Sequence, residues 1–133
     1  MKRVLLDTNA YARLLGGDAD ILDEVAEAEQ VNLSVFVMGE LLAGFRGGPR
    51  LTQNRQMLKA FLAKPTVTFL EASAETAEIF GQIKDALRKA GAPIPINDVW
   101  IAAHAMETGS ALVTYDGHFR GVPGLRLWTR MPA

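Results

Sequence analysis

The sequence contains no cysteine, which excludes a disulfide framework and any zinc site built on thiolates. It also lacks a long hydrophobic run, since no apolar stretch approaches the roughly 20 residues that span a bilayer. At the amino terminus a run of only three apolar residues directly precedes Asp7, which is too short for a secretory signal peptide. We therefore expect a soluble, cytoplasmic protein that makes no contact with membranes.

A large excess of charge of one sign is missing as well, because 14 Lys and Arg face 15 Asp and Glu, for a net charge of −1. The charges are unevenly distributed, however. Residues 18–29 contain six acids and no base, whereas residues 46–64 contain five bases and no acid. The near-neutral total therefore conceals one acidic and one basic segment.

The 133 residues contain no internal repeat or long linker, and 49% of them are hydrophobic, so a single domain over residues 1–133 is expected. Short apolar runs typical of strands alternate with segments of helical periodicity. This alternation predicts a mostly parallel, five-stranded sheet covered by helices on both faces. The expected strands are residues 3–7, 31–35, 67–71, 111–116 and 125–128, and the expected helices are residues 9–15, 18–29, 35–45, 51–63, 74–90 and 97–107.

Four of the fifteen acidic residues share an unusual feature: each is the only formal charge in its neighbourhood. Burying an isolated carboxylate is costly, and carboxylates that converge also raise one another's pKa values. A hard divalent cation such as Mg²⁺ or Mn²⁺ removes both costs, so the pattern predicts a metal site. The four residues are Asp7 (within residues 4–12), Glu40 (35–45), Asp98 (91–106) and Asp116 (108–119).

Each of these acids also has a local explanation. Asp7 can cap the helix that follows it, and Glu40 can lie on an exposed helix face. Asp98 stands at a helix start, where the macrodipole favours an acid, and Asp116 precedes a glycine in a typical turn pair. These alternatives stay open for single residues. The set as a whole favours a metal site, because Asp7 and Asp116 follow expected strands, where parallel sheets bind ligands.

The four motifs that hold these acids are LLDTNAY, VFVMGELLAGF, NDVWIAAHA and TYDGHF. In this order and at these spacings they resemble those of PIN domains, and most closely those of the VapC toxins of bacterial toxin–antitoxin pairs. The resemblance covers nearly the whole chain. It implies a three-layer α/β/α sandwich and an endoribonuclease in which one or two Mg²⁺ or Mn²⁺ ions activate water.

The resemblance also implies roles for individual residues. Asp7, Glu40, Asp98 and Asp116 would be the catalytic, metal-binding carboxylates. Thr8 and Thr114 match positions beside the site, where hydroxyl groups orient metal ligands. His118 is not an acid, so we expect it to be a substrate-contacting or surface residue, and His104 is expected to be structural. The expected partners are RNA, a VapB-like antitoxin and a second copy of the chain in a homodimer.

RNA binding requires positive charge. The basic segment is the best candidate for phosphate contacts, although a solvated helix face explains its charges equally well. The residues expected to contact RNA are Arg46, Arg50, Arg55 and Lys59.

Three other functions remain open. A haloacid-dehalogenase-like phosphatase would place a second aspartate two residues after Asp7, but that residue is Asn9. A PIN-like domain without catalytic activity would bind RNA or protein only. A PIN nuclease outside toxin–antitoxin systems would process RNA, and its sequence would carry the same four acids.

Overall fold

Four parallel strands form the sheet of the computed structural model, which describes residues 1–132. The strand over residues 3–6 pairs with a strand on each side: its Leu5 lies opposite Asn32 of one neighbouring strand and opposite Leu112 of the other. Every pairing is parallel, as the alternation of strands and helices predicted. The strands, in the spatial order β3-β2-β1-β4, are β1 (Arg3–Leu6), β2 (Gln30–Ser34), β3 (Val67–Leu70) and β4 (Ala111–Val113).

The expected fifth strand over residues 125–128 is wrong. This segment makes one isolated parallel bridge, between Leu127 and Leu112. β4 is only three residues long and offers little length to pair with. The Trp128 indole N–H then donates to the Thr114 carbonyl just beyond β4, which ends the extended run. The sheet therefore has four strands in the part of the chain that the structure describes.

The six expected helices are confirmed, with ends that shift by at most two residues. Two of the helices begin at a serine cap, since the Phe36 N–H donates to the Ser34 side chain and the Thr76 N–H donates to the Ser73 side chain. The helices are α1 (Thr8–Leu15), α2 (Ala19–Glu27), α3 (Val35–Arg46), α4 (Leu51–Leu62), α5 (Ala74–Ala90) and α6 (Ile96–Thr108), followed by the short 3₁₀ helix η1 (Gly117–Gly121).

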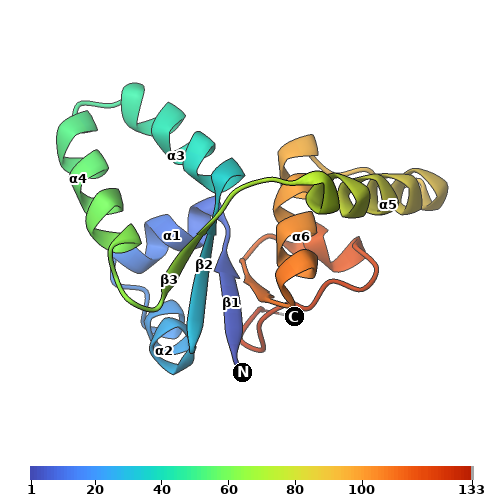
Figure 1. Cartoon of the computed structure of the whole chain (residues 1–133), viewed down its shortest axis with the longest axis horizontal. Coiled ribbons are helices and arrows are strands. Elements are labelled where there is room, and N and C mark those ends of the chain that lie inside the picture. The colour runs from blue at the N-terminus through green and yellow to red at the C-terminus, as the bar shows by residue number, and fades with distance from the viewer. Residues whose placement is uncertain (133) are drawn as a thin grey trace.

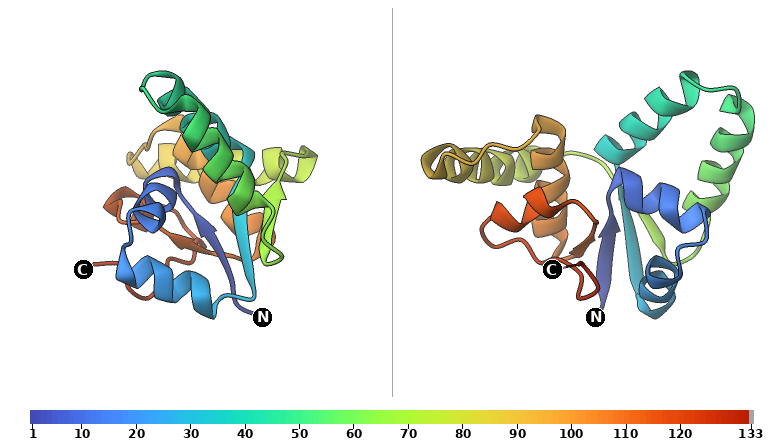
Figure 2. Two further views of the ribbon diagram at one scale, coloured as in Figure 1. Left: turned by 90° about the vertical axis from the view of Figure 1, so that its left-hand side faces the viewer. Right: turned by 180° about the vertical axis from the view of Figure 1, so that it is seen from behind.

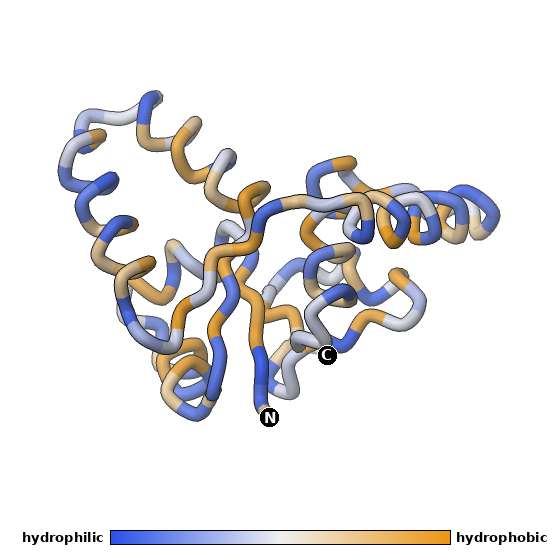
Figure 3. The backbone as a smooth tube through the Cα atoms, viewed as in Figure 1, coloured by the Kyte–Doolittle hydropathy of each residue, from blue (hydrophilic) through white to orange (hydrophobic). Residues whose placement is uncertain are grey.

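The helices form two layers around the sheet. The α1 and α2 helices and the α3–α4 hairpin lie on one side, and α5 and α6 lie on the other (Figures 1 and 2). The strands between them are largely apolar (Figure 3), and Val4, Leu5 and Leu6 of β1 are fully buried. No helix within residues 1–132 is both long and apolar enough to cross a membrane.

The strand order determines where the predicted site residues lie. The chain proceeds outward from β1 through β2 to β3, and then returns to place β4 on the other side of β1. Parallel sheets bind ligands at such reversals, outside the carboxyl ends of the strands. Asp7 directly follows β1 and Asp116 lies three residues after the end of β4, so both acids stand at this edge.

Candidate metal centre

Asp7 caps the helix that follows it, as its sequence position suggested, and it also lies close to other acids. Its Oδ1 accepts the Ala10 N–H at 2.8 Å and thereby caps α1. The residue is only 6% exposed. Burial raises the pKa of the Asp7 carboxyl group, and the charges of Asp98 and Asp116 raise it further, although hydrogen bonds from Thr114 and Ala10 oppose the rise. Asp7 is thus both a helix cap and a buried carboxylate that lies close to other carboxylates.

The buried Thr114 side chain connects the first and last acids of the set. Its hydroxyl oxygen accepts the Asp116 N–H at 2.9 Å, and its hydrogen bond to Asp7 lowers the pKa of that carboxyl group. Thr114 directly follows β4, which pairs with β1. It therefore links the two strand ends from which Asp7 and Asp116 project.

Asp98 lies in the first turn of α6 and is partly buried, with a side chain that is 21% exposed. Its Oδ2 lies 2.9 Å from Nε2 of His118, and no side chain caps the helix. Burial raises the pKa of Asp98, His118 counteracts this rise, and the charges of Glu40 and Asp116 add to it. The side chain of Asp98 therefore points to the acidic cluster and does not serve as a cap.

His118 lies between two of the predicted ligands. Its Nδ1 is 2.7 Å from Oδ1 of Asp116, while its Nε2 faces Asp98. One potential ligand atom from each of Asp98, Asp116 and His118 lies within 4.8 Å of the other two. Sequence reasoning missed this placement because it looked for an acid at residue 118. The sequence did carry one signal, the Asp-Gly-His spacing. In the structure the short 3₁₀ helix η1 brings the His118 ring next to the Asp116 carboxylate.

Glu40 reaches the cluster from α3. The residue is exposed, but its Oε1 accepts a 2.8 Å hydrogen bond from the Thr8 hydroxyl group at the start of α1. Its charge also contributes to the raised pKa of Asp98. Glu40 therefore lies at the rim of the acidic cluster, where the Thr8 hydroxyl group orients its carboxylate.

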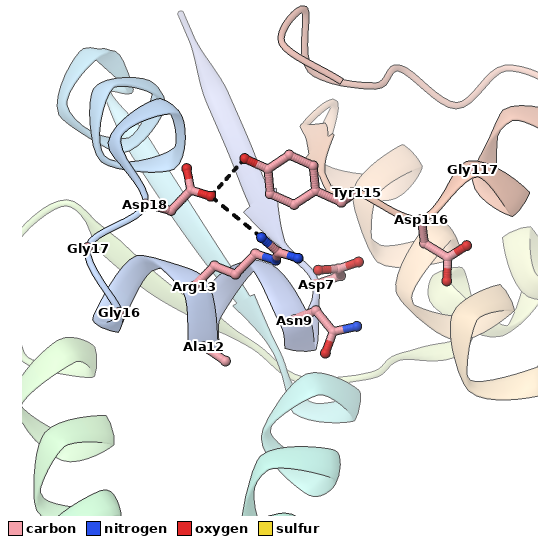
Figure 4. A pocket seen from close by; sticks show the side chains of 10 residues that line it. All are labelled: Asp7, Asn9, Ala12, Arg13, Gly16, Gly17, Asp18, Tyr115, Asp116 and Gly117. Atoms are coloured by element: carbon pink, nitrogen blue, oxygen red, sulfur yellow. Dashed lines mark hydrogen bonds and ion pairs between the residues drawn. The ribbon is translucent and has the colours of Figure 1, made fainter. Parts of the chain in front are cut away.

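A cavity of about 930 Å³ opens beside Asp7 and Asp116. Arg13 is the one positively charged residue in its lining, as far as the described chain extends. The Arg13 guanidinium lies 4.6 Å from the centre of the Tyr115 ring and 4.0 Å from Asp18, which accepts a hydrogen bond from the Tyr115 hydroxyl group (Figure 4). The acidic centre thus adjoins a cleft that carries a positioned arginine.

The predicted RNA-binding residues lie elsewhere. Arg46 ends α3, Arg50 precedes α4, and Arg55 and Lys59 lie along α4, all of them exposed. None lines the cavity that contains Asp7. Arg55 and Lys59 border a smaller hollow of about 210 Å³ between α3 and α4. Their contact with RNA stays a prediction.

The donor set fits a hard divalent cation. Carboxylate oxygens are the ligands that Mg²⁺ and Mn²⁺ prefer. Asp7 and Asp98 carry raised pKa values because burial and neighbouring carboxylates disfavour their charges, and a bound cation would relieve that unfavourable electrostatic energy.

Comparison with known proteins agrees with this architecture. The PIN domain family matches residues 4–125. Ribonuclease VapC4 of Mycobacterium tuberculosis is 29% identical over 97% of this chain and 98% of its own length. Ribonuclease VapC2 of Rickettsia felis is 28% identical over 92% and 94%, respectively. A chain in the crystal structure of VapBC2 from Rickettsia felis, bound to a DNA fragment from their promoter, superposes with a TM-score of 0.83 at 26% identity, covering 95% of this chain and 97% of that one.

The fold is a parallel sheet with helices on both faces, and acids gather at the carboxyl ends of its strands. The family match covers nearly the whole chain. The chain belongs to the PIN-domain family. The curated relatives that it matches within that family are VapC ribonucleases, which confirms the resemblance seen in the four motifs.

Proposed function

We propose that this chain is the toxin of a VapBC-type toxin–antitoxin pair, an endoribonuclease that hydrolyses RNA phosphodiesters with the help of Mg²⁺ or Mn²⁺. The observation that carries the proposal is the buried Asp7 carboxylate at the end of β1, close enough to Asp98 and Asp116 for their charges to raise its pKa. The VapC ribonucleases among the relatives support the same reaction.

In this proposal Asp7, Glu40, Asp98 and Asp116 hold one or two metal ions. Such an ion supplies a water of lowered pKa and polarises the phosphate. Thr8 and Thr114 fix the carboxylates of Glu40 and Asp7 through their hydrogen bonds, so that these side chains need no reorganisation when the ion binds. Hydrolysis of this kind leaves a 3′-hydroxyl and a 5′-phosphate.

A VapB-like antitoxin and a second copy of the chain are the proposed protein partners. Support for the antitoxin comes from the similar solved structure of VapBC2 from Rickettsia felis. The α3–α4 hairpin offers apolar surface for a partner helix, since Met57 of α4 is 44% exposed and Met38, Leu42 and Leu62 line the hollow between the two helices.

The test is a titration of Mg²⁺ and Mn²⁺ into the purified, antitoxin-free chain, with cleavage of a total RNA pool followed by end-group mapping. Asp98→Asn is run beside the wild type. We expect metal-dependent cuts that leave 5′-phosphates and disappear in the variant. Cuts that persist in Asp98→Asn would contradict the proposal, and metal binding without cutting would favour a PIN domain that only binds.

Arg13 leads to a prediction about the path of the RNA. Because Arg13 lines the cleft beside Asp7, Arg13→Gln should weaken single-stranded RNA binding and flatten its salt dependence by about 0.7 in log–log slope, the value for one lost phosphate contact. Binding is measured in the Asp98→Asn background, over a salt series. Arg50→Glu/Arg55→Glu tests the basic segment in the same way.

The matched control is Arg88→Glu on α5, where Arg88 is exposed and paired with Asp85. It should leave the salt slope unchanged. An unchanged slope in Arg13→Gln would remove the cleft from the RNA path, and an unchanged slope in the double variant would remove α4.

A further inference from the structure

We propose that His118 is itself a ligand of the metal, through Nε2, and that Asp116 orients it through a hydrogen bond from Nδ1–H. The inference rests on the proposed metal centre and goes beyond it by replacing a four-carboxylate site with a mixed site of carboxylates and one imidazole. This change makes the centre selective for Mn²⁺ over Mg²⁺.

The spacing of the atoms fits this role. Adjacent ligand atoms on an ion with bonds of about 2.1 Å lie about 3 Å apart. Nε2 of His118 lies 2.9 Å from Oδ2 of Asp98. One potential ligand atom from each of Asp98, Asp116 and His118 lies within 4.8 Å of the other two. An ion bound by Asp98 at this oxygen is therefore within reach of Nε2.

The other ring nitrogen also has the partner that a metal-binding histidine requires. Such histidines donate their second N–H to a carboxylate, a carbonyl or water, which fixes the tautomer and the ring orientation. Nδ1 of His118 lies 2.7 Å from Oδ1 of Asp116. In the structure Nε2 forms a 2.9 Å hydrogen bond with Oδ2 of Asp98. A bound ion would take the place of the proton between these two atoms, while Nδ1 keeps its contact with Asp116.

The local fold holds the imidazole in this position. Asp116 caps η1 by accepting the His118 backbone N–H at 3.2 Å. Phe119, which follows, is buried in the core and anchors the turn. The His118 side chain is only 30% exposed, and its ring packs against that of Phe119 with centroids 4.8 Å apart. The ring is therefore already oriented toward the site before an ion binds.

A nitrogen ligand changes which ion the site prefers. Mg²⁺ and Mn²⁺ both prefer oxygen donors, but Mn²⁺, as a first-row transition-metal ion, tolerates an imidazole nitrogen better than Mg²⁺ does. The ratio of Mn²⁺ to Mg²⁺ affinity should therefore be higher in the wild type than in His118→Asp, which restores an oxygen donor at the same position. His118→Gln should bind Mn²⁺ at least about tenfold more weakly, a loss that even residues behind a ligand can cause.

The decisive measurement is pulsed EPR of the Mn²⁺-loaded chain. A directly bound imidazole nitrogen modulates the electron spin echo, and carboxylate oxygens do not. We expect ¹⁴N modulation in the wild type and its loss in His118→Gln. His104→Gln controls for the second histidine of the chain, and calorimetric titration of Mn²⁺ and Mg²⁺ into each variant measures the selectivity.

The possible outcomes separate this inference from the proposed function. Bound Mn²⁺ without ¹⁴N modulation, or modulation that persists in His118→Gln, would overturn the assignment of His118 and leave the carboxylate site intact. No binding of Mn²⁺ by the wild type would refute the metal centre itself, and the His118 assignment with it.

Discussion

Asp7→Asn should reduce metal-dependent RNA cleavage by about 10²- to 10³-fold, the size of effect seen when one preorganised electrostatic group is lost from an active site. The same substitution should stabilise the metal-free protein. Asparagine caps helices as well as aspartate does, so the hydrogen bond to the Ala10 N–H can persist, while the buried charge is removed.

The sign of the stability change follows from the pKa of Asp7. Burial and neighbouring carboxylates raise that pKa above its value in the unfolded chain. The contribution of Asp7 to stability is therefore complete below the unfolded pKa and is lost as the pH rises through the folded pKa. At neutral pH, without metal, the charged Asp7 is destabilising.

The prediction is checked by thermal unfolding in EDTA at pH 7.5. Asp7→Asn should melt a few degrees above the wild type, since about 1 kcal/mol shifts the Tm of a domain of this size by roughly 3–5 °C. Adding Mn²⁺ should raise the wild-type Tm and leave the variant nearly unchanged. The control is Asp23→Asn, an exposed acid of α2, which should not alter either value. A variant that is less stable than the wild type in EDTA would show that Asp7 is chiefly structural.

Asp7 and Asp98 stand out in the sequence because each lacks a charged neighbour, a pattern that burial makes costly, and both are at least partly buried. Glu40 shows the same pattern but is exposed, and its role as a metal ligand stays a prediction. The pattern can be seen without knowing which of the acids lie close together in the fold. The local alternatives proved compatible with it: Asp7 and Asp116 each cap a helix and also face the cluster. A side chain with two oxygens can hold a backbone N–H with one of them and remain beside other carboxylates.

The features that sequence missed depend on distances across the fold. The Asp-Gly-His spacing can suggest the contact of His118 with Asp116, but nothing in the linear sequence indicates that Asp98 lies on the other side of the ring. Runs of like charge do not single out Arg13, because this arginine is isolated in the sequence. Tyr115, which is distant in the sequence, packs against its guanidinium group. The alternating segment over residues 125–128 has strand character, but only one residue of β4 pairs with it.

His104 gives the second large effect, on stability. The residue is 1% exposed and joins three elements. Its Nε2 lies 3.2 Å from the Glu71 carbonyl oxygen beyond β3. Because a carbonyl only accepts, Nε2 carries the proton, and Nδ1 accepts from the Ser34 hydroxyl group at 2.7 Å. That hydroxyl group in turn accepts the Phe36 N–H and caps α3. The neutral imidazole thus joins α6 to the ends of β2 and β3.

His104→Ala should lower the free energy of unfolding by about 3 kcal/mol, because it leaves a cavity and removes two hydrogen bonds from buried groups. His104→Gln, which retains a polar group of similar reach, should lose less. The measurement is urea denaturation in EDTA at pH 7.5. A loss below 1 kcal/mol in His104→Ala would mean that Ser34 and Glu71 find water in its place.

The same geometry predicts a pH dependence with the opposite sign to that of Asp7. Burial lowers the pKa of His104 below its ordinary value near 6.5. The unfolded chain therefore takes up a proton first as the pH falls. The contribution of His104 to stability is complete above the unfolded pKa and declines as the pH falls through it, by up to about 1.4 kcal/mol per pH unit.

Between pH 7.5 and 5.5 the wild type should lose more stability than His104→Gln. All other groups are common to the two proteins, and the carboxylates with lowered pKa values, Asp18, Glu27 and Asp85, titrate at lower pH. The difference between the two slopes therefore reports His104 alone, and equal slopes would mean that folding does not change the pKa of its imidazole.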